Sequence, residues 1–262
     1  MKVKQFVETL KNIAENYDTL YVMGCFGAEL KAGNVERYIK SYRYNQQDGV
    51  VENIRASVDA GIFGFDCVCL VKSVLWGWNG DKSSVYGGAV YKANGVPDIG
   101  ANRMIEQCTD ISEDFGNVEI GAFLWLEGHC GVYIGDGLAV ECTPIWKDGV
   151  QITAVKNIGE KAGYNSRRWT KHGRLPYVDY TPEEIPEETD PEEIKPEETE
   201  TPDATTETPE TETETPETIT PEEETTPEAP EITTKTNIFA ELLFDIFNAI
   251  IKAFREIFKR GG

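Results

Sequence analysis

The chain has 262 residues, with 46 acidic and 25 basic side chains and a formal net charge of −21. Most of this charge belongs to residues 181–236, which hold 21 acidic and two basic side chains. No part of the chain resembles a basic nucleic-acid-binding face, and an acidic chain is repelled by phosphate, so nucleic acid is excluded as a partner.

Composition divides the chain into three parts. Residues 1–180 contain all five Trp and all six Cys, and are long enough for one domain with its own core. Residues 181–236 consist mainly of Glu, Thr and Pro and cannot bury enough apolar surface to offset their conformational entropy. They are predicted to be a disordered, extended acidic linker. Residues 237–262 are apolar and periodic again.

The first part of the domain has helical periodicity. Phe6, Leu10 and Ile13 fall on one face of a helix over residues 3–17. Further helices are predicted at 49–60, from Cys67 to about Trp76, and at 101–108, while 21–27 form a strand fragment or turn and 77–100 a glycine-rich loop.

The period then changes to that of strands. Asp136-Gly137 is a turn of the kind that joins hairpins. Helices followed by a meander of strands indicate an α+β fold, in which the helices pack on the sheet. The predicted strands cover 120–126, 129–134, 138–142 and 149–155.

Cys67 follows a Gly-Phe-Asp turn and begins an apolar run that is predicted to be a helix. The partial positive charge at a helix N-terminus favours the thiolate, which is the nucleophilic form of cysteine. The alternative is a buried structural thiol, as expected for Cys25 and Cys108. Cys69 lies about 200° further around the helix and is predicted to point into the core.

His129 and Glu141 follow on successive predicted strands, so a nucleophile, a base and an orienting group occur in an order that suits covalent cysteine chemistry. The alternative for Glu141 is a solvent-facing carboxylate. The other histidine, His172, lies in a basic segment that is predicted to be an exposed turn.

The segment from Gly128 to Gly137 resembles the histidine hairpin of the NlpC-type, papain-like cysteine peptidases, which cut the peptide stems of bacterial peptidoglycan. Asp66-Cys67 is similar to the start of that family's cysteine motif, and Tyr21-Val22-Met23-Gly24 to its N-terminal element. The resemblance covers roughly residues 17–178. It implies a papain-like fold with Cys67 as nucleophile, His129 as base and Glu141 as the third polar residue.

The sequence departs from the family pattern in three places, one of which covers two residues. Val68 and Cys69 replace its Ser-Gly, Met23 replaces a Trp, and Glu141 replaces a His, Asn or Gln. A carboxylate can also orient an imidazole, and it stabilises the imidazolium more than an amide does.

By the same resemblance, Asp66 and Tyr21 are candidates for binding the substrate. A carboxylate beside the nucleophile suits the free ammonium of a peptide, and a Tyr hydroxyl can hold the thiolate or the amine. Asp66 also fits the position of an N-cap of the cysteine helix, and the two roles are compatible.

A zinc site is the competing interpretation of the Cys and His residues. Cys67-x-Cys69 is a poor chelating spacing, and His129 and Cys130 are expected on opposite faces of a strand. No metal or other cofactor is therefore predicted.

Residues 237–262 are predicted to form an amphipathic helix with an apolar arc of about 200°. Charged residues such as Glu241, Asp245 and Lys252 interrupt it, which argues against a membrane span. The helix is expected to lie on a membrane surface or to self-associate, with docking on the enzyme domain as a third option.

These features predict a peptidoglycan endopeptidase. Because the N-terminus does not resemble a secretory signal, the sequence suggests a phage endolysin made in the cytoplasm that acts on the cell wall after release. Two alternatives stay open at this point. One is an N-acetylmuramoyl-L-alanine amidase with similar chemistry, and the other is a catalytically weak scaffold whose tail is the working part.

Overall fold

A computed structural model of the chain describes residues 1–182. The predictions of an acidic linker over 181–236 and an amphipathic helix over 237–262 therefore fall outside the described residues, apart from the first two positions of the linker. No helix within residues 1–182 has both the length and the apolar character needed to cross a membrane.

Residues 1–182 contain five α-helices, and four of them were predicted. The helix at 49–60 is shorter than expected because Asp59 and Gly61 both have positive φ angles, of 56° and 77°, which end helical geometry. The helix that was missed is α2. The helices are α1 (Val3–Asn16), α2 (Val35–Ser41), α3 (Val50–Ala56), α4 (Cys67–Leu75) and α5 (Ala101–Gln107), with 3-10 turns at Tyr44–Gln46, Ala93–Gly95 and Phe115–Asn117.

A small sheet supports the cysteine helix. It has the order β1-β3-β2, with β1 parallel and β2 antiparallel to β3. Its strands are β1 (Thr19–Tyr21), β2 (Phe26–Glu29) and β3 (Phe63–Phe65). The expectation of a strand fragment or turn at 21–27 is thus fulfilled by the end of β1, a turn and the start of β2.

The larger sheet has seven strands in the order β4-β10-β5-β6-β7-β8-β9. Neighbours are antiparallel except for β8 and β9, and the predicted meander forms β5 to β8. The strands are β4 (Thr109–Ser112), β5 (Phe123–Leu126), β6 (His129–Gly135), β7 (Leu138–Thr143), β8 (Gly149–Val155), β9 (Ser166–Arg167) and β10 (Lys171–Arg174).

The strand predicted from residue 120 begins only at Phe123. Gly121 has a φ of 86°, and Ala122 N–H donates to the Glu119 carbonyl in a tight turn, so Ile120 stays outside the sheet and is 49% exposed.

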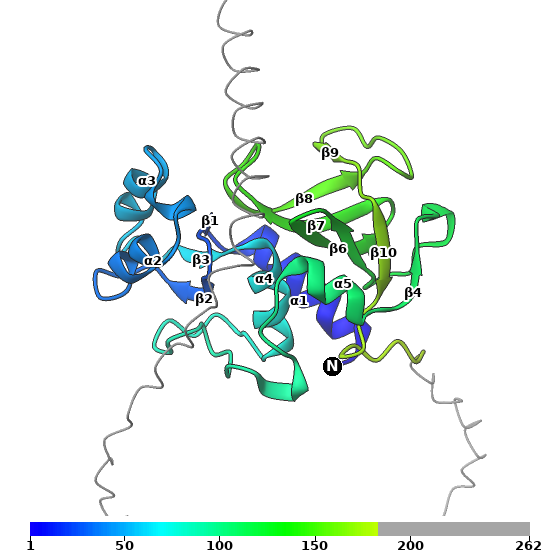
Figure 1. Cartoon of the computed structure of the whole chain (residues 1–262), viewed down its shortest axis with the longest axis horizontal. Coiled ribbons are helices and arrows are strands. Elements are labelled where there is room, and N and C mark those ends of the chain that lie inside the picture. The colour runs from blue at the N-terminus through cyan, green and yellow to red at the C-terminus, as the bar shows by residue number, and fades with distance from the viewer. Residues whose placement is uncertain (183–262) are drawn as a thin grey trace, which may run out of the picture. The chain divides into compact units, whose positions relative to one another are not determined.

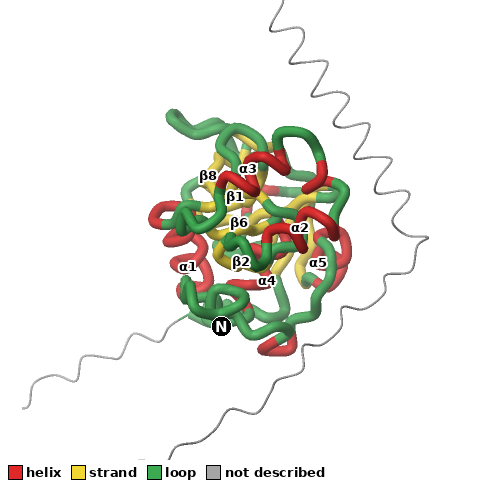
Figure 2. Tube along the Cα trace, turned by 90° about the vertical axis from the view of Figure 1, so that its left-hand side faces the viewer, coloured by secondary structure: helices red, strands yellow, loops and turns green. Residues whose placement is uncertain are grey.

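Helices α1, α4 and α5 lie against the larger sheet, while α2 and α3 lie beside the small sheet (Figure 1). Figure 2 shows the same arrangement from the side, with α2 and α3 toward the viewer and strands behind them. The main core joins the apolar faces of α1 and α4 to the central strands, through residues such as Phe6, Leu10, Val74, Val132 and Val140. The mixed α+β class is therefore confirmed.

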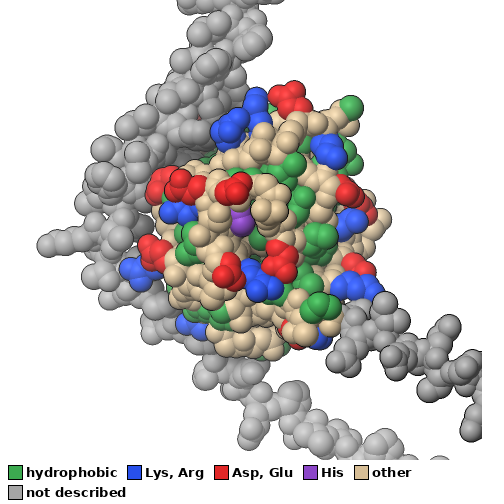
Figure 3. Space-filling model, turned by 90° about the vertical axis from the view of Figure 1, so that its right-hand side faces the viewer, with side chains coloured by type: hydrophobic (Ala, Val, Ile, Leu, Met, Phe, Trp, Pro, Cys, Tyr) green, Lys and Arg blue, Asp and Glu red, His purple; other side chains and the backbone are tan. Residues whose placement is uncertain are grey.

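Acidic and basic side chains are interspersed on the face of the domain shown in Figure 3, and neither kind forms a continuous patch there.

Candidate active site

Cys67 is the first residue of α4 and is separated from the end of β3 by Asp66 alone. Asp66 is the N-cap, with extended backbone angles, and its Oδ1 accepts a 2.7 Å hydrogen bond from the Cys69 N–H. This cap holds the start of α4 rigidly and places Cys67 at the positive end of the helix.

Both carboxylate oxygens of Asp66 are occupied within the protein. Oδ2 accepts from the Gly24 N–H at 2.8 Å and from the Cys69 thiol at 3.0 Å. Asp66 is buried, and its pKa is raised by burial and by the nearby charge of Cys67. The N-cap role is thus realised, and Cys69 is buried as predicted, where it completes the cap.

The register of β6 and β7 brings His129 to Glu141. Gly131 lies opposite Glu141, and His129 is two residues earlier on the same face of β6. His129 Nε2 lies 2.8 Å from Glu141 Oε2. The Glu141 side chain is 0% exposed, so the alternative of a solvent-facing carboxylate is wrong.

Glu141 has two further partners. Thr153 of β8 donates its hydroxyl to Oε1 at 2.6 Å, and Arg167 of β9 donates Nε–H to Oε2 at 2.6 Å. Burial alone would raise the pKa of Glu141. The hydrogen bond and charge of His129 outweigh burial, with smaller contributions from the charge of Arg167 and the hydrogen bond of Thr153, so the pKa lies below its usual value. Glu141 is therefore an ionised carboxylate in a buried place.

Cys67 interacts electrostatically with two residues of β6, Cys130 and His129. The pKa of Cys67 is lowered well below its usual value, and the largest cause is the hydrogen bond with the Cys130 side chain. Burial alone would raise this pKa. The hydrogen bond and the charge of His129 lower it further. Burial would lower the pKa of His129, but hydrogen bonds with Cys67 and Glu141 raise it to about 9. Because Glu141 occupies Nε2, Nδ1 is the ring nitrogen left to interact with the thiol. The pair is thus poised as thiolate and imidazolium.

Trp169 holds the imidazole from one side. Its ring stacks on His129 with centroids 5.6 Å apart and an angle of 7° between the planes. A Cβ on Gly131 would come within 3.0 Å of the Trp169 ring and 2.9 Å of the Val140 carbonyl, so only glycine lets the indole approach β6 this closely.

Tyr21 lies beside the nucleophile. It ends β1 opposite Phe65, and its ring packs edge-to-face on Tyr44 at 5.2 Å. Its pKa is raised by burial, and then by the charges of Cys67 and Asp66. The structure therefore brings together all five residues predicted for the site: Tyr21, Asp66, Cys67, His129 and Glu141.

The prediction of an exposed turn around His172 is wrong. His172 lies on β10 between β4 and β5 and is only 7% exposed. Its Nε2 is 2.9 Å from the carbonyl of Asp114, and its ring contacts Phe115 edge-on. Cys25 and Cys108 are buried, as predicted for structural thiols, and burial raises their pKa values to about 11 and about 12.

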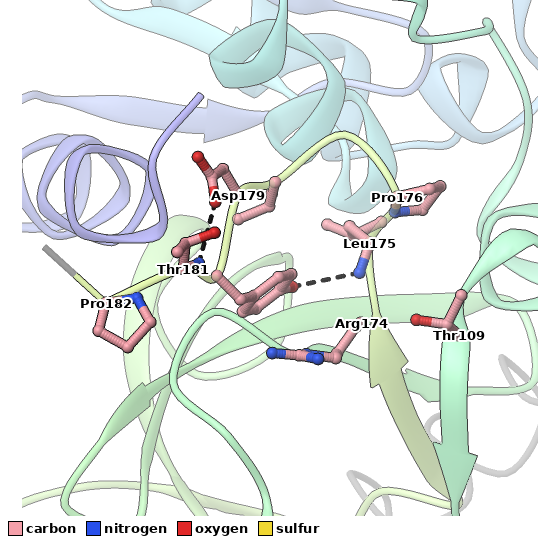
Figure 4. Close-up of a pocket in the computed structure, with 9 residues that line it drawn as sticks. Thr109, Arg174, Leu175, Pro176, Asp179, Thr181 and Pro182 are labelled. Atoms are coloured by element: carbon pink, nitrogen blue, oxygen red, sulfur yellow. Dashed lines mark hydrogen bonds between the residues drawn. The ribbon is translucent and has the colours of Figure 1, made fainter.

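Two hollows of about 410 and 500 Å³ lie along β4 and β10, and neither is lined by Cys67, His129 or Glu141; His172 and Asp114 line the second. The first is formed where the chain leaves β10, between Arg174, Leu175 and the turn that ends at Thr181 (Figure 4). Neither hollow contains a cysteine. Within residues 1–182, no three His, Cys, Asp or Glu side chains come together in a way that could hold a metal ion.

Sequence reasoning missed three residues of the site: Cys130, Arg167 and Trp169. Cys130 follows His129 in the chain and was expected to point away from the site, on the opposite face of the strand. In the structure both Cys130 and His129 interact with Cys67. Arg167 and Trp169 come from a segment with no readable periodicity, and only the adjacent Arg-Arg-Trp composition singles it out.

A comparison with protein-family models gives no match to this chain, and a search of curated proteins finds no significant relative. Function is therefore inferred from the chemistry of the site.

Proposed function

We propose that this chain is a peptidoglycan hydrolase with a papain-like domain of the NlpC type over residues 1–180, and that it cuts an amide bond in the stem peptide. The observation that carries the proposal is the continuous series of contacts from Cys67 through His129 to the buried Glu141. An activated thiol, an imidazole beside it and a carboxylate that orients the imidazole are the groups that acyl transfer through cysteine requires.

In the proposed reaction, the Cys67 thiolate attacks the carbonyl carbon of the scissile amide. The carbon–nitrogen bond breaks as His129 gives its proton to the leaving amine, and a thioester forms on Cys67. His129 then accepts a proton from water, which attacks the thioester and releases the acid. The backbone N–H of Cys67, in the first turn of α4, is the proposed donor to the oxyanion.

The resemblance to the NlpC-type family supports the choice of substrate, because the hairpin carrying His129 and the Asp66-Cys67 turn are the motifs shared with wall-cutting enzymes. Tyr21 and Asp66 are the proposed substrate-binding residues. The phage endolysin setting and a membrane or self-association role for residues 237–262 remain predictions from the sequence.

Digestion of purified cell walls tests the proposal. The wild type is expected to release stem-peptide fragments, and Cys67→Ala to lose about 10³-fold or more of the rate. Cys108→Ala is the matched control, since it removes another buried thiol from outside the site and should keep the rate. Equal release by Cys67→Ala and the wild type would overturn the proposal.

Mass spectrometry of the fragments identifies the bond. New amino termini within the stem indicate an endopeptidase, whereas stems released whole from the sugar indicate the amidase alternative.

A further inference from the structure

We propose that Arg167 is a positioning residue that balances the charge of Glu141 and so controls how strongly Glu141 holds the His129 imidazole. This inference rests on the proposed function, because it assigns Arg167 a role in the same cysteine–histidine chemistry.

The first observation is that two cations share one oxygen. Glu141 Oε2 lies 2.8 Å from His129 Nε2 and 2.6 Å from Arg167 Nε, while Oε1 is occupied by Thr153. The Glu141 side chain is 0% and the Arg167 side chain 12% exposed. In so buried a place, water screens charges poorly and an uncompensated charge is costly.

The second observation is that Arg167 is fixed in position. Its Nη2 donates to the Thr143 hydroxyl at 3.3 Å, and its guanidinium lies over the rings of Trp146 at 4.9 Å and Trp169 at 5.8 Å. Its carbonyl accepts a 2.8 Å hydrogen bond from the Lys156 N–H, which ties β9 to the end of β8. These contacts hold the guanidinium, and therefore its positive charge, beside Glu141.

A further argument comes from the charge count of the proposed reactive state. A thiolate at Cys67, an imidazolium at His129 and a carboxylate at Glu141 sum to one negative charge, and Arg167 makes the group neutral. Because Arg167 competes for Oε2, it also weakens the hold of Glu141 on the imidazolium. His129 can then release its proton to the leaving group more readily.

The remaining groups near these side chains cannot replace Arg167. Glu141 is faced by His129 from β6, Thr153 from β8 and Arg167 from β9. Of these only Arg167 carries a permanent charge. The ionisable groups that act on Cys67 are His129 and Cys130 of β6, Asp66, Tyr21 of β1 and Cys142 of β7.

The test is the pH dependence of Cys67 alkylation by iodoacetamide in the full chain, followed by peptide mass spectrometry. Arg167→Gln leaves an extra negative charge and should raise the midpoint for Cys67 by about one pH unit. Glu141→Gln leaves an extra positive charge and should lower it. The double variant restores neutrality and should return the midpoint to within about 0.3 units of the wild type.

Arg168→Gln is the matched control, because it removes the same charge from the exposed neighbouring position and should leave the midpoint unchanged. An unshifted midpoint in Arg167→Gln would overturn the proposal, as would a double variant that departs further from the wild type than either single variant. If Arg167→Gln does not fold, Arg167→Lys decides: it keeps the charge and should keep the midpoint, and a shift of a full unit would overturn the proposal.

Wall digestion by the same proteins separates the two proposals. If the midpoints shift as expected but the wild type does not digest walls, the charge-balancing role of Arg167 is supported and the proposed hydrolase function is overturned. A digesting wild type with an unshifted Arg167→Gln would overturn only the role of Arg167.

Discussion

The two histidines of the larger sheet are similarly buried but differ in what surrounds them. His129 on β6 faces the buried carboxylate of Glu141 and contacts Cys67, whereas His172 on β10 faces the backbone carbonyl of Asp114. A carboxylate and a thiolate stabilise an imidazolium with two full charges, and a carbonyl offers only a partial one. The charge of its partners, rather than its burial, therefore gives a histidine its catalytic potential.

Replacing each histidine by Ala gives the largest expected contrast. His129→Ala should lower the rate of wall digestion by about 10³-fold or more, because the thiolate loses its cation and the leaving group its proton donor. His172→Ala should change the rate less than about threefold but cost about 1–2 kcal/mol of stability through the unsatisfied Asp114 carbonyl. Digestion rates and urea unfolding measure the two effects, and an equal loss of activity in both variants would break the contrast.

Removal of Glu141, the charged partner of His129, is expected to have the next largest effect. Glu141→Ala leaves Arg167 unpaired in a buried place and should cost about 3–5 kcal/mol of unfolding free energy. Activity should fall about 100-fold as the imidazole loses its orientation. Glu160→Ala, which removes an exposed carboxylate paired with Lys156, serves as the control and should change stability by less than about 1 kcal/mol. A Glu141→Ala protein as stable as this control would contradict the described geometry.

The pH dependence of activity and of stability tests the charge state of His129 and Cys67. Activity requires the thiolate and the imidazolium, so it should fall about tenfold per unit as pH rises above the His129 pKa of about 9. Stability should respond differently. Between the lowered pKa of Cys67 and the His129 pKa of about 9, the folded pair carries one proton, on His129. Over the part of that range that lies between 6.5 and 9.0, the ordinary pKa values of the two groups, the unfolded chain also carries one proton, on Cys67. Proton binding then balances, and this pair contributes no slope to stability over that range. Activity that does not fall as pH rises above about 9 would contradict the ion pair.

The smallest expected effect concerns the ring that supports His129. Trp169→Phe keeps a stacking surface, and the indole N–H it removes has no hydrogen-bond partner among residues 1–182. We expect a threefold or smaller loss of activity and about 1–2 kcal/mol of stability, because the smaller ring leaves a cavity. A loss as large as that of His129→Ala would mean that Trp169 contacts the substrate.

Local patterns account for the parts of the fold and site that were predicted correctly. The apolar period identifies α1 and α4, and Asp66 identifies the start of α4. Alternation and the Asp136-Gly137 turn identify β6 and β7, whose pairing brings Glu141 beside His129.

The parts that were missed depend on pairing between distant segments. β9 has two residues and runs parallel to β8, so nothing in the local sequence marks Arg167 as a partner of Glu141. β10 is short and basic and becomes a buried strand only because β4 and β5 flank it, which is why His172 was expected to be exposed. Trp169 reaches His129 because Gly131 lacks a side chain, a fit that emerges only in three dimensions.

The central claim is that Cys67 is an activated nucleophile because of His129. The most direct measurement is the rate at which each of the six cysteines reacts with iodoacetamide at pH 6, in the wild type, His129→Ala and His172→Ala. We expect Cys67 alone to react rapidly in the wild type and in His172→Ala, and to become slow in His129→Ala. A Cys67 that reacts no faster than the other five thiols, or equally fast without His129, would contradict it.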